Sequence, residues 1–251
     1  MHPKGNFVRI LWAIMKRELA GYFGSPVAYV FLVIFLLLSG FFTFYLSRFF
    51  EAGQADLQGF FQWHPWLFMF LVPAVAMRLW AEERRLGTLE LLFTFPVTPT
   101  EAILGKFLAA WCFIGIALFL TFPLVLTTLY LGSPDLGVTF CAYVGSFLMA
   151  GVFLSVGSMT SALTRSQVVS FILAVVICLF LILAGFPPII QMFSGWAPLW
   201  LVDGVASISV ITHFAAISRG VLDLRDILYY LSVMGFMIVV NGVILQNRES
   251  A

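Results

Sequence analysis

Residues 77–108 read MRLWAEERRLGTLELLFTFPVTPTEAILGKFL, and this stretch gathers charge in a chain that otherwise carries little of it. Of the chain's 13 Lys and Arg and 12 Asp and Glu residues, eight fall within it: Arg78, Glu82, Glu83, Arg84, Arg85, Glu90, Glu101 and Lys106. Long apolar stretches lie on both sides. This pattern is typical of a polar loop that joins two membrane-spanning helices.

The composition of the whole chain supports the same interpretation. Of its 251 residues, 62% are hydrophobic and 10% are charged. A soluble domain has about 25% charged residues, and a soluble globule of this size could not bury so much apolar side chain. We therefore expect an all-α integral membrane protein. The net charge of +1 gives no indication of a nucleic-acid partner.

Six segments are apolar enough to be membrane-spanning helices, and each has, or nearly has, the required length of ~20 residues. They are residues 26–46, 64–81, 106–131, 138–163, 167–188 and 226–246. The first is too long for the core of a signal peptide, which has roughly 7–15 residues, and no small-residue cleavage site follows it. We expect it to be retained. Pro73 and Pro123 lie in the second and third spans, where we expect kinks.

The distribution of Lys and Arg predicts the orientation, because these residues favour the cytoplasmic side. With both termini cytoplasmic, ten of them fall in inside segments: Lys4, Arg9, Lys16, Arg17, Arg78, Arg84, Arg85, Lys106, Arg165 and Arg248. Three fall outside: Arg48, Arg219 and Arg225. The charged segment 82–105 is then a cytoplasmic loop.

Two further segments have an expected structure. Residues 4–25 repeat apolar side chains at helical spacing, which predicts an amphipathic helix on the inner membrane surface; the alternative is a plain cytoplasmic tail. Residues 189–225 are too apolar for a free loop and contain Trp196 and Trp200. We expect short helices there that dip into the outer leaflet, because Trp favours the headgroup level. A seventh full span is the alternative.

The charged loop itself is expected to hold a defined shape. Residues 82–93 read as a helix with Leu86 on its apolar side. Thr98, Pro99 and Glu101 form the pattern of a capping box, which begins a second helix that runs through Gly105 and Lys106 into the third span. A mere connector would not need these features. We interpret the loop as a docking surface for a cytoplasmic partner.

This loop resembles that of ABC-2-type permeases, the membrane subunits of ATP-binding-cassette exporters. The stretch EERRLGTLELLFTFPVTPTEAILGKFLA carries that family's acidic pair, basic residue, Gly-Thr, Glu, Thr-x-Pro turn and Gly-Lys. The matching residues are Glu82, Glu83, Arg84 or Arg85, Gly87, Thr88, Glu90, Thr94, Pro96, Gly105 and Lys106. Residues 213–232, HFAAISRGVLDLRDILYYLS, resemble the gliding-motility-type branch, of which the nitrous-oxide-reductase maturation permease is a close cousin.

The resemblance implies a mechanism. Residues 1–25 would be an N-terminal cytoplasmic segment and 26–251 the transmembrane domain. Two permease subunits, identical or different, would pair, and each would dock one cytoplasmic ATP-binding-cassette ATPase through the helix 82–93. ATP and Mg would be bound by that ATPase, because this chain has no phosphate-binding loop: Phe107 follows Gly105-Lys106, and Thr100 replaces the first Gly. We therefore expect a transporter subunit and not an enzyme, with no catalytic residue or cofactor of its own.

Other interpretations stay open. A secondary transporter or a structural subunit independent of ATP is the main alternative, although the spans have few of the charges that ion-driven carriers use. A membrane enzyme or metal site would need clustered His, Cys or carboxylates, and the cysteines Cys112, Cys141 and Cys178 are read as apolar core residues. The apolar interior suits export of an amphiphile, or force transmission to an outer-face auxiliary protein. Gly151, Ser155, Ser158 and Ala162 form a small-residue stripe that we assign to packing within one subunit.

Overall fold

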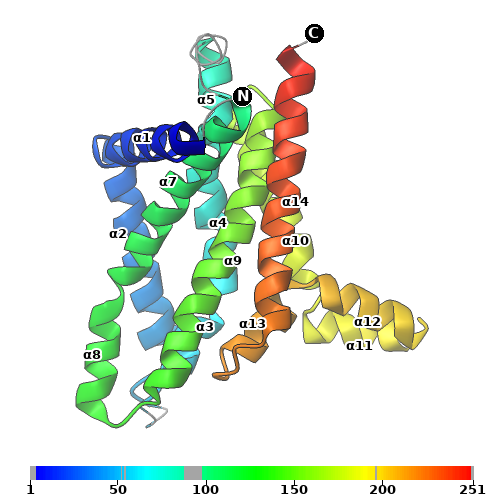
Figure 1. The fold of residues 1–251 in the computed structure, drawn as a ribbon. Coiled ribbons are helices and arrows are strands. Elements are labelled where there is room, and N and C mark those ends of the chain that lie inside the picture. Colours follow the sequence, from blue (N-terminus) through cyan, green and yellow to red (C-terminus); the bar gives the residue numbers. More distant parts are fainter. Residues whose placement is uncertain (1–3, 52, 54, 88–97, 196, 250–251) are drawn as a thin grey trace.

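The chain is all-α in a computed structural model that describes every residue except 1–3, 52, 54, 88–97, 196 and 250–251 (Figure 1). The helices that cross the bundle are α2 (Pro26–Phe41), α4 (His64–Ala76), α5 (Arg78–Leu86), α7 (Pro99–Phe119), α8 (Phe122–Leu131), α9 (Leu136–Leu163), α10 (Gln167–Leu183) and α14 (Leu224–Glu249). The remaining elements are α1 (Lys4–Phe23), the π-helix η1 (Phe42–Leu46), α3 (Gln58–Gln62), α11 (Pro187–Ser194), α12 (Leu199–Ile208) and α13 (Val210–Ile217). The described residues form no strand, so the predicted fold class is confirmed.

Five straight or gently bent segments are long and apolar enough to cross a membrane. They are Pro26–Leu46, His64–Leu86, Pro99–Leu131, Leu136–Leu163 and Leu224–Gln246, and each overlaps a predicted span. The predicted fifth span, 167–188, is too long. The helix α10 ends at Leu183, and after a bend of 68° the chain continues as α11, which begins at Pro187.

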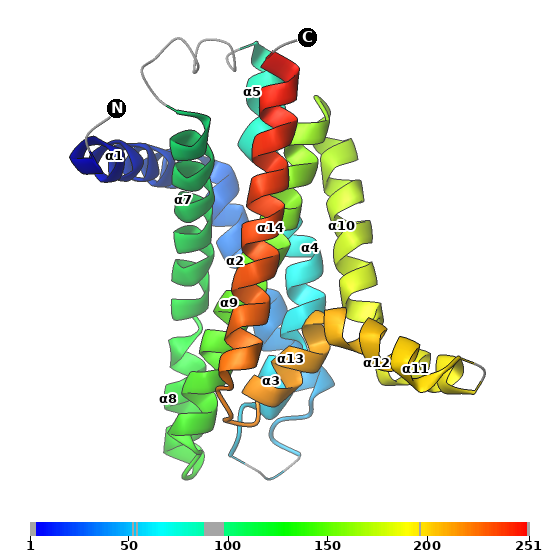
Figure 2. The same ribbon diagram turned by 45° about the vertical axis from the view of Figure 1, so that its right-hand side comes forward.

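One end of the bundle carries α1, the last turn of α5, the first turn of α7 and the end of α14; we call it the α5 end (Figures 1 and 2). The opposite end, which carries α8, is called the α8 end. The α7–α8 span breaks between Phe119 and Phe122, and Pro123 lies in the first turn of α8. The kink predicted at Pro123 is therefore confirmed. Pro73 lies inside α4, and the helix is interrupted four residues later, at Met77.

The N-terminal helix α1 lies across the α5 end and packs against α7 (Figure 1). Ile14 of α1 is 9% exposed and lies against Gly105 of α7. A Cβ at Gly105 would approach the Ile14 Cγ2 to 2.6 Å, so the glycine permits this close crossing. On the other side of α1, Val8 and Trp12 are exposed. The helix predicted for 4–25 is confirmed, and its place on a membrane surface stays a prediction.

The segment 189–225 consists of short helices and contains no straight seventh span. The helices α11 and α12 lie side by side and project sideways from the bundle (Figure 2), and α12 meets α13 at a bend of 72°. His213 fastens this segment to the last span: its Nδ1 lies 2.6 Å from Asp226 Oδ1, and its Nε2 lies 3.0 Å from the Ser207 carbonyl. Short helices are confirmed, while contact with the outer leaflet stays a prediction.

The long helix α9 forms the centre of the bundle and packs against α4, α7, α10 and α14. Its small residues permit these contacts: Gly151, Ser155, Ser158 and Ala162 are all buried within the chain. The predicted role of this stripe, packing within one subunit, is confirmed. At the neighbouring Gly157, a Cβ would overlap the Ala76 Cβ of α4, so this glycine sets the distance between α4 and α9.

Candidate coupling site at the α5 end

The helix α5 carries the run of charges on which the sequence prediction rests, but it ends earlier than predicted. Gly87 adopts a left-handed conformation with φ of 69°, and its N–H donates to the Glu83 carbonyl. A glycine in this conformation ends a helix, because other residues reach it at a steric cost. A single helix over 82–93 is therefore wrong: the helix is the continuation of the second span and stops at Leu86. The candidates Thr88, Glu90 and Pro96 lie outside the described residues.

The first turn of α7 has the predicted capping box. The Thr98 Oγ1 accepts from the Glu101 N–H at 3.3 Å, and the Thr98 N–H donates to Glu101 Oε2 at 2.8 Å. Pro99 occupies the first turn, where a missing N–H removes no hydrogen bond. Glu101 is 5% exposed, so this carboxylate is occupied in the cap. The box fixes where α7 begins, seven residues before Lys106.

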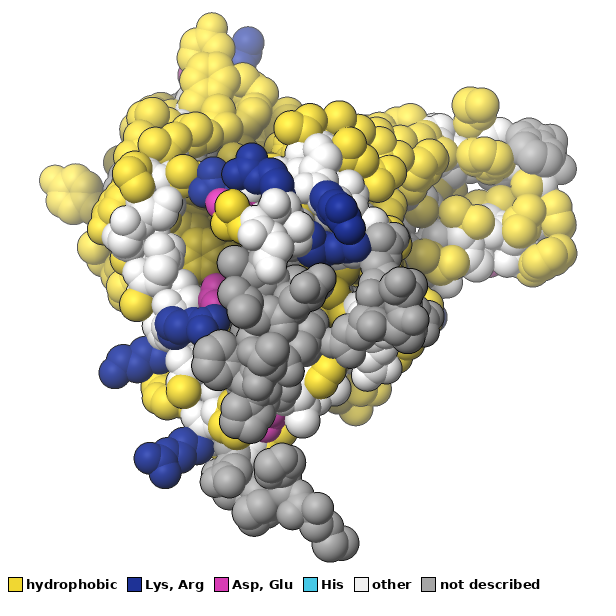
Figure 3. Space-filling view, turned by 90° about the horizontal axis from the view of Figure 1, so that it is seen from above, with side chains coloured by type: hydrophobic (Ala, Val, Ile, Leu, Met, Phe, Trp, Pro, Cys, Tyr) yellow, Lys and Arg dark blue, Asp and Glu magenta, His cyan; other side chains and the backbone are white. Residues whose placement is uncertain are grey.

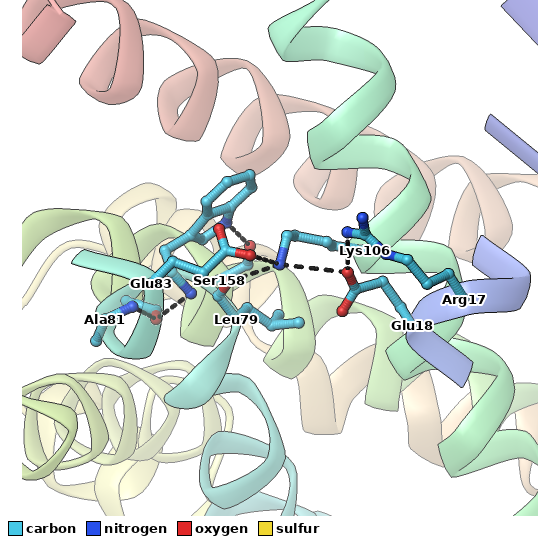
Figure 4. Close-up of polar contacts among 9 residues, drawn as sticks. Arg17, Glu18, Leu79, Ala81, Glu83, Lys106 and Ser158 are labelled. Atoms are coloured by element: carbon cyan, nitrogen blue, oxygen red, sulfur yellow. Dashed lines mark hydrogen bonds and ion pairs between the residues drawn. The ribbon is translucent and has the colours of Figure 1, made fainter. Parts of the chain in front are cut away.

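Lys106 joins three helices at this end of the bundle (Figure 4). Its Nζ lies 2.7 Å from Glu83 Oε1 of α5 and 3.7 Å from Glu18 Oε1 of α1. It also donates to the Leu79 carbonyl at 3.3 Å and lies 5.2 Å from the centre of the Trp80 ring. The Lys106 side chain is 4% exposed. A buried cation with these partners holds α1, α5 and α7 together, and we call the set Lys106, Glu83 and Glu18 the lysine clasp.

A second polar contact fastens the start of α5 to α9. Ser161 Oγ accepts from the N–H groups of Trp80 and Ala81, at 3.0 and 2.9 Å, and donates to the Met77 carbonyl at 2.9 Å. The first turn of any helix leaves N–H groups without intrahelical acceptors, and here another helix supplies the acceptor. Ser161 is fully buried. Without it these N–H groups would lose their acceptor, at about 1–3 kcal/mol for each buried group left unsatisfied.

The last span contributes to the same contact through Asn241. Its Nδ2 donates to Ser158 Oγ at 2.8 Å, and Trp80 Nε1 donates to the same oxygen at 3.2 Å. Figure 4 shows Ser158 beside the clasp. Polar side chains in spanning helices commonly bond across to a neighbouring helix. The start of α5 is therefore bound directly to α9 and is linked to α14 through Ser158.

The four consecutive charges of α5 divide into two groups. Glu83 is part of the clasp, and an Arg84 guanidinium nitrogen donates to the Ala162 carbonyl at the end of α9. Glu82 is half-buried and lines a pocket, whereas Arg85 and Leu86 are exposed. Within the described part of the chain, Glu82 and Arg85 have no hydrogen-bonding or ionic partner. Of the predicted residues that are described, the structure thus pairs Glu83 with Lys106, turns Glu83 and Arg84 inward and leaves Arg85 exposed.

The electrostatic character of this end is mixed. Lys and Arg side chains gather on it, with a few acidic side chains among them (Figure 3). Burial raises the pKa of Tyr22 on α1 above its ordinary value, the Glu18 carboxylate raises it further, and the Arg78 guanidinium opposes this shift. Tyr22 therefore stays protonated. Among the described residues, no three His, Cys, Asp or Glu side chains lie together in a way that could hold a metal ion.

Comparison with protein families matches residues 12–233 to the model of the ABC-2 family transporter proteins. The chain belongs to the ABC-2 family of transporter proteins. The match covers the clasp, Ser158, Ser161 and the bundle up to the first ten residues of α14, and Asn241 lies beyond it. This ABC-2 protein is thus a multi-pass membrane transport component. A search of curated proteins found no match.

Three residues of the ABC-2 site were missed at the sequence level: Glu18, Ser161 and Asn241. Glu18 follows two basic residues in a surface helix and looks like an ordinary solvated charge. Ser161 lies in a helix with many small residues, beside Ala162 of the small-residue stripe, and nothing in the sequence sets it apart from them. Asn241 gave the clearest signal, because a single amide in the middle of an apolar span needs a partner.

Proposed function

We propose that this ABC-2 protein is the permease subunit of an exporter, driven by a separate ATP-binding-cassette ATPase that docks at the α5 end. The observation that carries the proposal is the exposed tip of α5, formed by Arg85 and Leu86, at the end of a helix fastened to the bundle. An exposed cation beside an exposed apolar side chain suits a protein partner. The segment 88–97, with Thr88 and Glu90, would extend this docking surface.

The contacts at the start of α5 support a path for movement from the ATPase into the bundle. Ser161 ties α5 to α9, and Lys106 ties it to α1 and α7. Displacement of the α5 tip would therefore act on α7 and α9 together. ATP and Mg would be bound and hydrolysed by the ATPase, and a second permease subunit would complete the transporter.

The proposal includes the orientation, with the α5 end on the cytoplasmic side of a bacterial inner membrane. Its support is the Lys and Arg at this end (Figure 3). We expect Glu51→Cys, exposed near the α8 end, to react with a membrane-impermeant maleimide added to intact cells. Lys16→Cys, exposed on α1, should react only in opened membranes. The unmodified chain controls for Cys112, Cys141 and Cys178. The reverse pattern would invert the orientation.

The docking surface is tested by the double variant Arg85→Glu/Leu86→Ser. We expect binding of the ATPase, recovered with the tagged chain in mild detergent, to fall by about tenfold or more, equivalent to ~1.4 kcal/mol. The thermal unfolding midpoint should stay unchanged, because both side chains are exposed. The matched control is Leu224→Ser/Arg225→Glu, which makes the same changes in exposed residues at the other end of the bundle. Unchanged recovery in the first variant would refute this docking surface.

The alternative function is transmission of force to a partner on the outer face, without export of a molecule. It is favoured by the resemblance of residues 213–232 to the gliding-motility-type branch, and by the projection of α11 and α12 from the bundle. A secondary transporter or structural subunit would need no ATPase. Recovery of the chain alone, without ATP hydrolysis, would favour that reading over both ATP-driven ones.

A further inference from the structure

A pocket of about 530 Å³ opens at the α5 end between α1, α2, the α4–α5 segment and α7. Its volume lies within the range of roughly 300–1,000 Å³ that is usual for small-molecule sites. Nothing in the proposed docking of an ATPase uses its interior. The pocket has an apolar part between α2 and α4 and a polar mouth beside the lysine clasp.

The apolar part is open toward the outer surface of the bundle. Val27, Val30 and Ile34 of α2 line it and are 43%, 56% and 42% exposed. Leu71 and Ala74 of α4 line the facing wall. These side chains belong to two spanning segments, so this opening faces the hydrocarbon of the bilayer. An acyl chain can enter the slot from the side without leaving the membrane.

In the described part of the chain, the mouth contains an arginine Nε and a carboxylate that lack partners. Lys106, Glu83 and Glu18 are occupied in the clasp. The Arg78 Nε is buried and has no hydrogen-bond partner within the described residues. Glu82 likewise has no partner there, and although it is one helical turn from Arg78, the two do not form an ion pair. A buried guanidinium N–H without an acceptor is destabilising, so an occupant that supplies one is favoured.

The occupant that fits has an acceptor anion, a cationic donor and an apolar chain. A phosphate would accept from Arg78, and an ammonium group would donate to Glu82. An amphiphile whose only headgroup charge is a phosphate would leave Glu82 unpaired. It would also bring a negative charge to a mouth that already has three carboxylates, Glu18, Glu82 and Glu83, and only two cations. The charges of the mouth therefore favour a zwitterionic headgroup over an anionic one.

We propose that this pocket binds an ethanolamine phospholipid of the surrounding leaflet, with its phosphate at Arg78, its ammonium at Glu82 and an acyl chain between α2 and α4. The proposal goes beyond the ATPase-driven function and does not depend on it, because it concerns the isolated chain. It adds a lipid site whose headgroup contacts lie on α5 itself.

The test is retention of defined lipids by the purified, delipidated chain, measured by native mass spectrometry. The probes are dioleoyl-phosphatidylethanolamine and dioleoyl-phosphatidylglycerol, which differ in the ammonium group. We expect the wild-type chain to retain the ethanolamine lipid at least about fivefold better. Arg78→Gln should lower retention of both lipids, and Glu82→Gln should lower only that of the ethanolamine lipid. Equal retention of the two lipids by the wild-type chain would overturn the proposal without any variant.

Matched variants separate the pocket from general lipid contact. Arg85→Gln and Glu51→Gln make the same chemical changes at exposed positions outside the pocket and should retain the ethanolamine lipid as the wild type does. Gly21→Leu places a side chain into the pocket that Gly21 lines, and its Cβ meets no atom within 4 Å, so α1 accommodates it. It should abolish the preference, whereas Gly40→Leu, equally open on α2, should not. Unchanged retention in both Gly21→Leu and Arg78→Gln would also refute the site.

Discussion

Lys106→Met is expected to lower the free energy of unfolding by about 2–3 kcal/mol. Removing one partner of a fully buried ion pair costs roughly 3–5 kcal/mol, because the other charge is left uncompensated. Lys106 is 4% exposed, but the Glu83 and Glu18 side chains are 23% and 22% exposed, so water screens part of the loss. The variant also removes the additional hydrogen bond that Lys106 Nζ donates to the Leu79 carbonyl. Thermal or denaturant unfolding in one detergent measures the change.

The control for this prediction is Lys16→Met, an exposed lysine of α1 at the same end of the bundle, which should change stability by no more than about 0.5 kcal/mol. A double-mutant cycle with Glu83→Gln isolates the pair. If the clasp holds α5 to α7, the double variant is more stable than the sum of the single effects predicts. Strict additivity would mean that Lys106 and Glu83 do not interact.

Gly157→Leu is expected to destabilise the bundle by about 3 kcal/mol, at the upper end of typical overpacking effects. A Cβ at this position already overlaps the Ala76 Cβ and comes within 3.7 Å of the Pro73 Cα, and neither atom can move aside without the backbone of α4. Replacing a helical glycine gains only about 1 kcal/mol of helix propensity, so the steric effect dominates. The unfolding midpoint and the yield of folded protein measure it.

Gly235→Leu is the matched control, because Gly235 lies in α14 and a Cβ there meets no atom within 4 Å. This variant should be neutral or slightly stabilising. If Gly157→Leu were equally tolerated, α4 and α9 would not be held at the separation seen here.

The sequence predicts much of this fold, because the length and hydropathy of a spanning helix are set by the bilayer. The capping box at Thr98 was also readable, since all its members lie within four residues. The predicted end of α5 was wrong. The prediction followed the helical spacing of Leu89, Leu92 and Phe93 in the sequence and overlooked Gly87, which is a helix stop signal. The end of α10 had a similar signal in Gly185 and the Pro187–Pro188 pair.

The site was less predictable because its contacts join residues far apart in the chain. Ser161 and Asn241 bond to partners about eighty residues away. Periodicity states which face of a helix is apolar but not which helix will lie against it. For the same reason the pairing of Glu83 with Lys106, twenty-three residues later in the chain, was not predicted, and a contact of Glu83 with an ATPase stays a prediction.

The interruption at Met77 has a mechanical consequence. A break between α4 and α5 would ordinarily act as a hinge, and a push on the tip of α5 would be absorbed there by bending. Ser161 of α9 restrains this break because its hydroxyl bonds to both sides of it. It donates to the Met77 carbonyl and accepts from the N–H groups of Trp80 and Ala81. In the proposed coupling, the second span would then act as a lever that pivots on α9, so that a small movement of the α5 tip at one membrane face would reach the far side of the membrane instead of being lost at the joint.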